Sequence, residues 1–579
     1  MKTPKKLFAL LALMVLLCAA LLSACASEAA PAEESAPQAT EEVAAAAPEE
    51  NPTEAPKSDQ SSDGSTQEQP SGSFSAQGEL VSDIGFRPEQ NGFGFPNYGG
   101  EPGVQNLTET EMRRLFGDQV CARLDGDVCE LTPPGQQWME QINGAMSVGH
   151  CEGMATLSLL FYSGQIATDQ FGGDPFAFSF SKDNEALQRE IAYWWATQTV
   201  TPTRAQVIKG TPTDILEVLK QMQSGGETYT VGIYKRDGSG GHAVTPFGVE
   251  DQGNGIFAIL VYDNNYPSET RRIMVDSNQN TWSYEAAINP SVEPDLYEGD
   301  ADTMTLDLTP SQARLSVQDC PFCAGESTGK GGNNHLASAP AYNEVYLDGE
   351  GHLQIVDEQD HRLGFVDGKL VNEIPGANYT AYRMDTLTDY PEPVYQLPSE
   401  MNIMATIDGS TLKEESATDM VIIGKGFFFG IEGIALSPDQ KDNVIFQPAD
   451  ELLSYDTDSS ESPNIVIGVE QPAADYSFEI QGADMEGGGT ITVSLDSKNS
   501  NLLINTEKLT NEGLFNLVLT RITDEAEESF TAEDIALKAG AQIYIEYGKW
   551  EGNGKGLYIG VDTNGDNVID DEYEVTDAQ

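Results

Sequence analysis

Apolar and polar positions follow two different periods along the chain, and the change falls near residue 225. Between about 107 and 224 the apolar residues recur at the three- and four-residue spacing of helices. From Thr228 onward the apolar runs are short and are broken by Gly, Asp and Asn, as in strands joined by turns. Helices are expected at 107–112, 184–195 and 213–222, and strands at 229–234, 242–249 and 255–262. Helices followed by antiparallel strands predict an α+β domain, which we place at 85–310.

Short strands and turns fill the rest of the chain. Residues 351–357, 476–480 and 490–493 have the composition of strands. We therefore expect two all-β modules, a β-rich module at 341–473 and a β-sandwich-like module at 474–579. A linker that contains a CxxC motif is expected at 311–340, because its second half is rich in Gly, Ser and Asn.

The N-terminal segment has the three parts of a secretory signal peptide. Basic residues precede an apolar run from 7 to 22, and small residues follow it. The ending Leu22-Ser23-Ala24-Cys25 resembles the lipobox of bacterial lipoproteins. The resemblance implies that 1–24 is a removed signal peptide and that Cys25 is lipidated, which places the protein on the outer face of the cytoplasmic membrane, at the cell surface. An ordinary signal peptide or an uncleaved anchor is the alternative.

The stretch after Cys25 has little that could form a core. Residues 26–75 are mostly Ala, Glu, Pro, Ser, Thr and Gln, with Phe74 as the one aromatic residue. Such a composition cannot offset the entropy lost on ordering the chain. We expect a disordered acidic tether at 25–84 that separates the folded part from the membrane.

The overall charge narrows the set of partners. The chain has 93 acidic and 31 basic residues, and its formal net charge at pH 7 is −62. A charge of this sign argues against nucleic-acid partners and against adhesion to anionic lipid heads. Contact with the membrane is therefore expected only through the lipid on Cys25.

The cysteines separate into pairs and one remainder. The chain has seven, of which Cys18 lies in the leader and Cys25 would carry the lipid. Cys121 and Cys129 lie close together in sequence, as do Cys320 and Cys323, and in an oxidising exterior both pairs are expected to form disulfides. Cys151 is left over, and an odd cysteine in an exported protein is a candidate reactive thiol.

Three residues could form a nucleophilic site. Cys151 stands directly before an apolar run, 156–162, so it would begin a buried helix whose N-terminus favours the thiolate. A thiolate nucleophile needs a base, and His242 begins a predicted strand. The next strand ends at Asp263 and Asn264, either of which could orient the imidazole. A buried core cysteine and a packed histidine are the alternatives.

The order Cys, His, Asp on a helix and a following sheet resembles the papain-like cysteine peptidase superfamily, in particular its compact bacterial branch of bacteriocin-processing peptidases. The resemblance covers about 105–300 and implies Cys151 as nucleophile, His242 as base and Asp263 as the orienting residue. It also implies an oxyanion donor shortly before the cysteine, for which Asn143 is preferred over Gln141.

The sequence departs from the family pattern at two positions. Ala145 stands six residues before the cysteine, where the family usually has Gln, and Glu152 replaces the Trp that follows the papain cysteine. His150 is a further candidate base, but adjacent residues at a helix start point apart, which favours His242.

The C-terminal tail carries oxygen ligands at alternate positions. Asp562, Asn564, Asp566 and Asp570 resemble the calcium loops of dockerins, although only one copy is present. Tyr573 holds the twelfth position, so Glu572 or Glu574 would have to complete the ligand set. An acidic turn without metal is the alternative. No cofactor is expected for catalysis, and structural calcium is the one ion that the sequence suggests.

Together these features predict a surface-tethered cysteine hydrolase that cleaves peptide or amide bonds through Cys151, His242 and Asp263. Its substrate would be a peptide, a protein or cell-wall material, and transfer to an amine is possible with the same triad. The alternative is a non-catalytic binding or adhesion lipoprotein that uses the papain-like part as a scaffold and the β modules as its binding surface.

Overall fold

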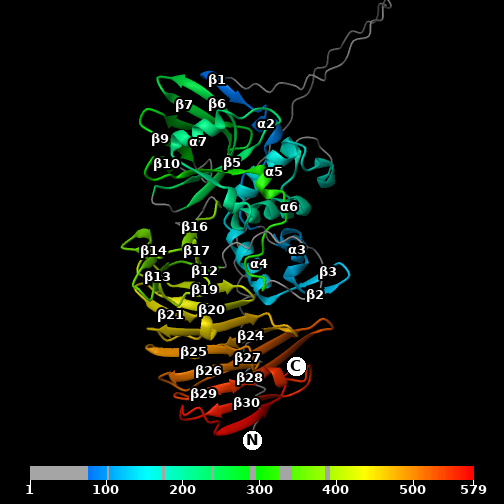
Figure 1. The fold of residues 1–579 in the computed structure, drawn as a ribbon, viewed down its shortest axis with the longest axis vertical. Coiled ribbons are helices and arrows are strands. Elements are labelled where there is room, and N and C mark those ends of the chain that lie inside the picture. The colour runs from blue at the N-terminus through cyan, green and yellow to red at the C-terminus, as the bar shows by residue number, and fades with distance from the viewer. Residues whose placement is uncertain are drawn as a thin grey trace, which may run out of the picture. The chain divides into compact units, whose positions relative to one another are not determined.

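The computed structural model describes residues 76–100, 103–172, 177–236, 240–286, 295–324, 342–384 and 392–578. The leader, Cys25 and the tether as far as residue 75 lie outside the described residues. Helices occupy the first part of the described chain and antiparallel strands the remainder, so the predicted sequence of an α+β part followed by an all-β part is confirmed (Figure 1). Among the described residues, no helix combines the length and the apolar character needed to cross a bilayer.

Local signals set where the helices begin. Thr108 and Glu111 form a capping box at the start of α3, and Thr211 with Asp214 does the same for α7. Asn184 caps α6 through its side chain. The helices are α2 (Pro88–Asn91), α3 (Glu109–Phe116), α4 (Pro133–Met146), α5 (Cys151–Tyr162), α6 (Glu185–Ala196) and α7 (Pro212–Leu219).

An antiparallel sheet follows the helices and supplies the other half of the α+β part. Its hydrogen-bonded order is β10-β9-β8-β7-β6-β5-β11-β4, and β1 pairs with the far end of β6. The strands are β1 (Glu79–Asp83), β4 (Ile208–Lys209), β5 (Tyr229–Tyr234), β6 (Gly241–Gly253), β7 (Ile256–Tyr262), β8 (Thr270–Asp276), β9 (Thr281–Ala286), β10 (Asp295–Asp300) and β11 (Leu306–Pro310). The strands predicted at 229–234, 242–249 and 255–262 are confirmed as β5, β6 and β7.

Helix α5 lies against this sheet and is buried along almost its whole length. Leu159 of α5 packs in one core with Phe247 and Val249 of β6, and each large apolar side chain buried there contributes about 1.5–3 kcal/mol. The helix is enclosed by the rest of the α+β part, as the apolar run 156–162 predicted.

Two stretches expected to lie outside the α+β domain are part of it. The predicted tether, 25–84, overlaps β1, whose register against β6 pairs Leu80 with Glu250. Five residues carry too weak a pattern to be recognised without their partner strand. The predicted linker, 311–340, begins with packed residues, since Phe322 is buried against Phe116 and Trp138. Residues 325–341 lie outside the described residues.

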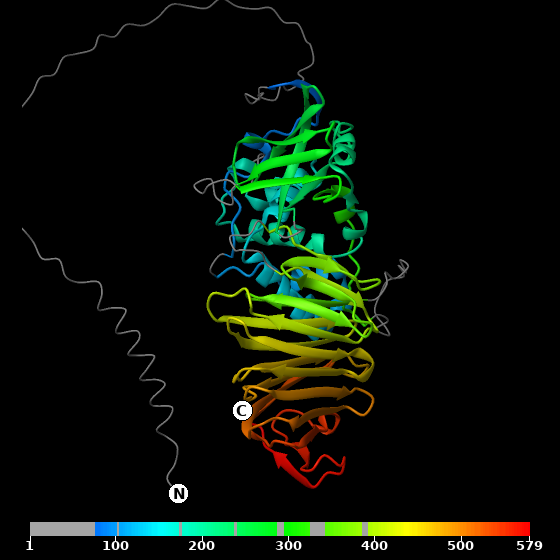
Figure 2. The ribbon, with the colours of Figure 1, turned by 90° about the vertical axis from the view of Figure 1, so that its left-hand side faces the viewer.

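The described residues of 342–578 form two antiparallel sheets that share one apolar core, in the manner of a sandwich. In Figure 1 this region runs from β14, β16 and β17 at its upper end to β30 at its lower end, and the colours of the turned view in Figure 2 change in the same direction from green through yellow and orange to red. The boundary predicted at residue 474 falls in the turn between β23 (Asn464–Val469) and β24 (Asp475–Gln481), which pair with each other. Core and sheets are therefore continuous across it.

One sheet of this β region has the order β16-β17-β12-β19-β20-β23-β24-β27-β28, with the further bounds β12 (Tyr342–Asp348), β16 (Asn378–Thr380), β17 (Val394–Pro398), β19 (Ser416–Gly424), β20 (Phe427–Leu436), β27 (Gly513–Ile522) and β28 (Glu527–Leu537). The other has the order β15-β14-β13-β18-β21-β22-β25-β26-β29-β30-β31, with β13 (His352–Asp357), β14 (Arg362–Val366), β15 (Lys369–Asn372), β18 (Ile403–Asp408), β21 (Lys441–Gln447), β22 (Leu452–Thr457), β25 (Gly489–Asp496), β26 (Asn501–Lys508), β29 (Gln542–Ile545), β30 (Leu557–Asp562) and β31 (Asp571–Val575).

Candidate active site

Cys151 is the first residue of helix α5 and is fully buried. His150 is the N-cap residue, and neither of the disulfides described below uses Cys151. The backbone N–H groups of a first helical turn lack acceptors within the helix, so this end of α5 carries positive potential. The fold thus puts Cys151 at the positive end of a buried helix.

His242 lies near the start of β6, beside the cysteine. The backbone N–H of the next residue, Ala243, donates to Sγ of Cys151 at 3.4 Å, and these two residues form a small buried cluster with Ala155. The imidazole of His242 is itself fully buried, and its Nε2 lies 2.8 Å from Oδ1 of Asp263. Cys151 and His242 are therefore brought to adjoining backbone from a helix and a strand.

Asp263 follows the last residue of β7 and holds several hydrogen bonds. Besides His242, its carboxylate accepts from the backbone N–H of Asn265 at 2.9 Å and from the hydroxyl of Tyr284. Burial by itself would raise the pKa of Asp263, but the charge of His242 and these hydrogen bonds more than offset burial, and the pKa lies below its ordinary value. The carboxylate is therefore kept ionised beside the imidazole.

The structure distinguishes Asp263 from its neighbour Asn264, which the sequence left open. The amide Nδ2 of Asn264 donates to the carbonyl oxygens of Cys151, at 3.1 Å, and of Ala243, at 3.0 Å. Asn264 thus ties helix α5 to strand β6, while Asp263 contacts the histidine.

His150, the other candidate base, is used elsewhere. Its ring stacks on Tyr98 at a centroid distance of 4.4 Å, with Nδ1 2.8 Å from the carbonyl oxygen of Tyr98 and Nε2 3.1 Å from Oδ1 of Asn106. Both ring nitrogens face groups on the segment before α3, so the geometry favours His242 as the base.

The structure does not bring Asn143, the expected oxyanion donor, to the cysteine. Asn143 lies on α4, and its side-chain amide exchanges two hydrogen bonds with the backbone of Leu107, at 2.8 and 3.0 Å. Gln141, the other candidate, is buried on the same helix. A short separation in sequence from Cys151 was not a sufficient guide to the contacts of Asn143, because α4 ends before the turn that leads to Cys151.

Asn97 holds the residue before Cys151 and was not recognised in the sequence. The side-chain Oδ1 of Asn97 accepts from the backbone N–H of His150 at 2.8 Å, and the backbone N–H of Asn97 donates to the backbone carbonyl oxygen of Asn264 at 2.9 Å. Asn97 therefore joins the turn before Cys151 to the turn after Asp263. Its place between small and aromatic residues, in Gly-Phe-Pro-Asn-Tyr-Gly, was the only available signal.

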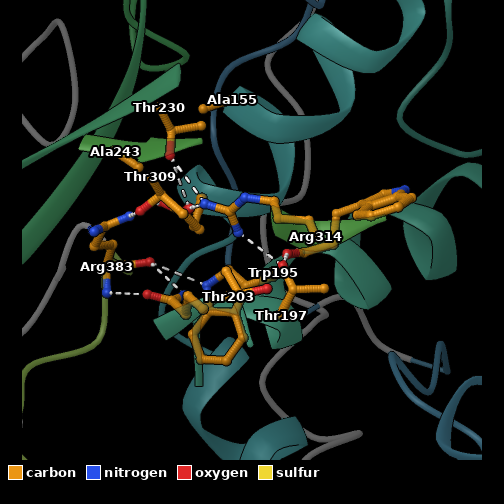
Figure 3. A network of polar contacts seen from close by, with 12 residues as sticks. Ala155, Trp195, Thr197, Thr203, Thr230, Ala243, Thr309, Arg314 and Arg383 are labelled. Atoms are coloured by element: carbon orange, nitrogen blue, oxygen red, sulfur yellow. Dashed lines mark hydrogen bonds and ion pairs between the residues drawn. The ribbon is translucent and has the colours of Figure 1, made fainter. Parts of the chain in front are cut away.

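Glu152, next to the cysteine, is the centre of a buried ionic network. One carboxylate oxygen contacts Arg314, and the other accepts from Nη1 of Arg383 at 2.9 Å. Figure 3 shows the two arginines approaching from opposite sides, with Thr230 and Thr309 between them. Burial by itself would raise the pKa of Glu152, but the charges of Arg383 and Arg314 hold it at about 2. Glu152 is thus a paired, ionised carboxylate.

Both predicted disulfides are confirmed. Cys121 and Cys129 join β2 (Cys121–Asp125) to β3 (Val128–Leu131) with an S–S distance of 1.97 Å, and Cys320 and Cys323 are bonded at 2.07 Å.

The candidate calcium residues lie in the turn between β30 and β31. Asp562 is fully buried, and its carboxylate accepts backbone N–H groups of Asn564 at 3.0 Å and Asn567 at 2.6 Å. Asp570 accepts from Thr563, and Asp566 from the N–H of Val568. No group of three or more His, Cys, Asp or Glu side chains is arranged to hold a metal within the described part of the chain. The calcium loop stays a prediction.

Comparison of the chain with family models, with curated proteins and with solved structures finds no match. The functional argument therefore depends on the geometry of Cys151 and its neighbours.

Proposed function

We propose that the protein is a papain-like cysteine hydrolase that cleaves peptide or amide bonds, with Cys151 as nucleophile, His242 as general base and Asp263 as the residue that orients the base. The observation that carries the proposal is the buried 2.8 Å contact of His242 with Asp263, beside a cysteine that heads a helix and receives the N–H of Ala243. The leader and Cys25 support an extracellular, lipid-anchored site of action.

The geometry supports a two-step reaction. Because Nε2 of His242 faces Asp263, the thiol proton would pass to Nδ1. The thiolate then attacks the carbonyl carbon, the C–N bond breaks, and the imidazolium returns its proton to the leaving amine. Water attacks the resulting thioester with His242 again accepting the proton, and the carboxylic acid product leaves.

The oxyanion would be stabilised by the first turn of α5 and by Asn97. Asn97 is held by its hydrogen bond from His150, and its Nδ2 is directed toward the other side of the nucleophile turn, where it lies 3.5 Å from the carbonyl oxygen of Met384. We assign this role to Asn97 because the amide of Asn143 is engaged with Leu107.

The test is the pH dependence of Cys151 alkylation by iodoacetamide. A thiolate stabilised by His242 reacts nearly as fast at pH 6 as at pH 9, whereas an ordinary thiol with a pKa of about 8.5 reacts about two orders of magnitude more slowly at pH 6. The ratio of the two rates cancels the effect of burial. We expect a ratio near one in the wild type and a steep ratio in His242→Gln.

The matched control is His361→Gln, since His361 also pairs with a carboxylate, Asp357, at 2.8 Å, but on the exposed side of the β region. This variant should keep the wild-type ratio. Digestion of a peptide library should cease in Cys151→Ala. A steep ratio in the wild type, or turnover by Cys151→Ala, would exclude the mechanism.

A further inference from the structure

A short segment of the β region, 382–384, lies at the candidate active site. The backbone N–H of Met384 donates to the carbonyl oxygen of Gly241 at 2.9 Å, and Gly241 directly precedes His242. The carbonyl oxygen of Met384 lies 3.5 Å from Nδ2 of Asn97, the residue that also holds the turn before Cys151. One residue therefore contacts the segments that carry the base and the nucleophile.

Glycines make the room that this segment needs. A Cβ added to Gly149 would lie 1.7 Å from the carbonyl oxygen of Met384. One added to Gly241 would lie 2.8 Å from the carbonyl oxygen of Tyr382, and one added to Gly232 would lie 2.5 Å from Nε of Arg383. Any larger residue at these positions would displace the segment or move the backbone around it. The absence of side chains at Gly149, Gly232 and Gly241 thus leaves the space that residues 382–384 fill.

The backbone of the segment is also held from the side of helix α6. The N–H of Arg383 donates to Oε1 of Gln198 at 2.9 Å, and the carbonyl oxygen of Arg383 accepts from Nε1 of Trp195 at 3.1 Å (Figure 3). Main-chain hydrogen bonds to an extended segment, with a pocket for its side chain, are the usual way in which proteins bind peptides.

The side chain of Arg383 enters a pocket that contains the carboxylates of Glu152 and Asp307, and Glu152 directly follows Cys151. Its guanidinium donates to Glu152 at 2.9 Å, to Asp307 at 2.6 Å and to Thr309 at 3.0 Å, and the side chain is 5% exposed. The planar, multiply bonded arrangement matches a guanidinium and not an ammonium. Glu152 also contacts Arg314, whereas in the described part of the chain the ion pair of Asp307 is with Arg383 and its other side-chain partner is the hydroxyl of Tyr234.

We infer that Glu152 and Asp307 form a subsite for an arginine side chain of the substrate, and that 382–384 occupies the cleft of this chain as a substrate-like ligand. The inference rests on the proposed function and extends it. The carbonyl group of Met384, beside Asn97, marks where the carbonyl group of the cleaved peptide bond binds. Arg383 precedes Met384, so the preferred substrate has an arginine immediately before the residue whose carbonyl group is attacked. The internal segment must leave before such a peptide can bind.

The test measures peptide binding to the full chain without turnover. The variant Cys151→Ala with Arg383→Gln vacates the pocket, and calorimetry compares acetyl-Tyr-Arg-Met-amide with acetyl-Tyr-Gln-Met-amide. Charge-assisted hydrogen bonds in a buried pocket predict at least about tenfold tighter binding of the arginine peptide. In Cys151→Ala with Arg383 intact, both peptides should bind at least about tenfold more weakly. Equal affinities of the vacated variant for the two peptides would overturn the inference.

A second measurement separates occupation of the cleft from simple tethering of the β region. Arg204 also crosses to that region, donating to Thr380 and Gln396 at 2.6 Å, but does not enter the pocket. At constant pH, Arg383→Gln should raise the alkylation rate of Cys151 by at least about tenfold, and Arg204→Gln by less than about twofold. Equal increases would mean that Arg383 only anchors the β region.

Circular dichroism and thermal melting check that each variant is folded. If Arg383→Gln unfolds, Met384→Pro replaces it, because proline removes the N–H that Gly241 accepts and leaves the charges in place. The same outcomes then decide. Binding is measured with Ala at position 151, so its result does not depend on whether Cys151 is a thiolate, which the alkylation ratio tests separately.

Discussion

The surroundings of Cys151 and the β region differ in what decides the pKa of their buried carboxylates. At Glu152 and Asp263 cationic partners outweigh burial, so that the pKa of Glu152 is held at about 2 and that of Asp263 lies below its ordinary value. At Asp307, which shares Arg383 with Glu152, burial still raises the pKa. In the β region burial, with like charges nearby for Glu432 and Glu470, raises the pKa of Glu432, Glu470 and Asp475 to about 7.

The difference is related to the small number of basic side chains in the chain and to where they lie. With 31 basic residues against 93 acidic ones, most carboxylates cannot have a cationic partner. Two arginines nevertheless converge on Glu152, and a histidine faces Asp263. Cationic partners therefore accompany the buried carboxylates of Glu152 and Asp263 beside Cys151, while burial disfavours the anionic form of Glu432, Glu470 and Asp475 in the β region.

The largest effect is expected from Asp263→Asn. The amide cannot stabilise the imidazolium and favours the wrong tautomer of His242, so kcat/KM should fall by about 10³- to 10⁴-fold, measured on a peptide that the wild type cleaves. Asp475→Asn is the control, because it removes a buried carboxylate of the β region that no histidine or arginine faces in the described residues. Similar losses in both variants would break the comparison between the two regions.

Glu152→Gln should lower the free energy of unfolding by about 3–5 kcal/mol, because two buried guanidiniums lose their shared counter-charge. Urea unfolding measures this change. Glu130→Gln is matched, since Glu130 pairs with Arg123 on the partly exposed β2–β3 hairpin, and it should cost less than about 1 kcal/mol. A loss of less than about 1 kcal/mol in the free energy of unfolding for Glu152→Gln would mean that Glu152 does not form ion pairs with Arg314 and Arg383.

The stability of the protein should fall both at low pH and at high pH, because some buried carboxyl groups have lowered pKa values and others have raised ones. Glu152 and Asp263 have lowered pKa values, so their contribution is present above their ordinary pKa and is lost as the pH falls toward 2. Glu432, Glu470 and Asp475 have raised values, so their contribution is present below their ordinary pKa and is lost as the pH rises through about 7. Stability should therefore be greatest near pH 5, judged by the melting temperature.

A variant sharpens this prediction. Asp475→Asn should reduce the loss of stability at high pH and leave the loss at low pH unchanged, because it removes one of the groups with a raised pKa and none with a lowered one. A melting temperature that rises steadily from pH 5 to pH 8 in the wild type would contradict the assignment of the β-region carboxylates.

Calcium should give the smallest effect. An ion in the turn that contains Asp562 and Asp566 would supply a cationic partner to the carboxylates of that turn, and about 1 kcal/mol of binding corresponds to a rise in the melting temperature of about 2–4 °C. Asp566→Asn should remove the rise, because the Asp566 carboxylate otherwise only receives the N–H of Val568 in the turn. An identical response of the wild type and the variant would argue for an acidic turn without metal.

Much of the local structure was predictable because its causes are local. The capping residues Thr211 and Asp214, the strand 229–234 and the disulfide between Cys121 and Cys129 depend on neighbours a few positions away. The strand Glu79–Asp83 was missed because it is defined by its pairing with Asp251–Gly248 in β6.

For the candidate site, the sequence by itself determined the residue types and their order: a cysteine before an apolar helix, a histidine opening a strand and an acidic residue ending the next. Only the tertiary structure decided which groups meet. It directed Asp263 and not Asn264 to His242, joined Asn97 to the turn before Cys151 while engaging Asn143 with Leu107, and brought Arg383 to Glu152 across 231 positions of sequence. The physical reason is that hydrogen bonds and buried ion pairs depend on ångström-scale placement, whereas periodicity specifies only which face of an element is apolar.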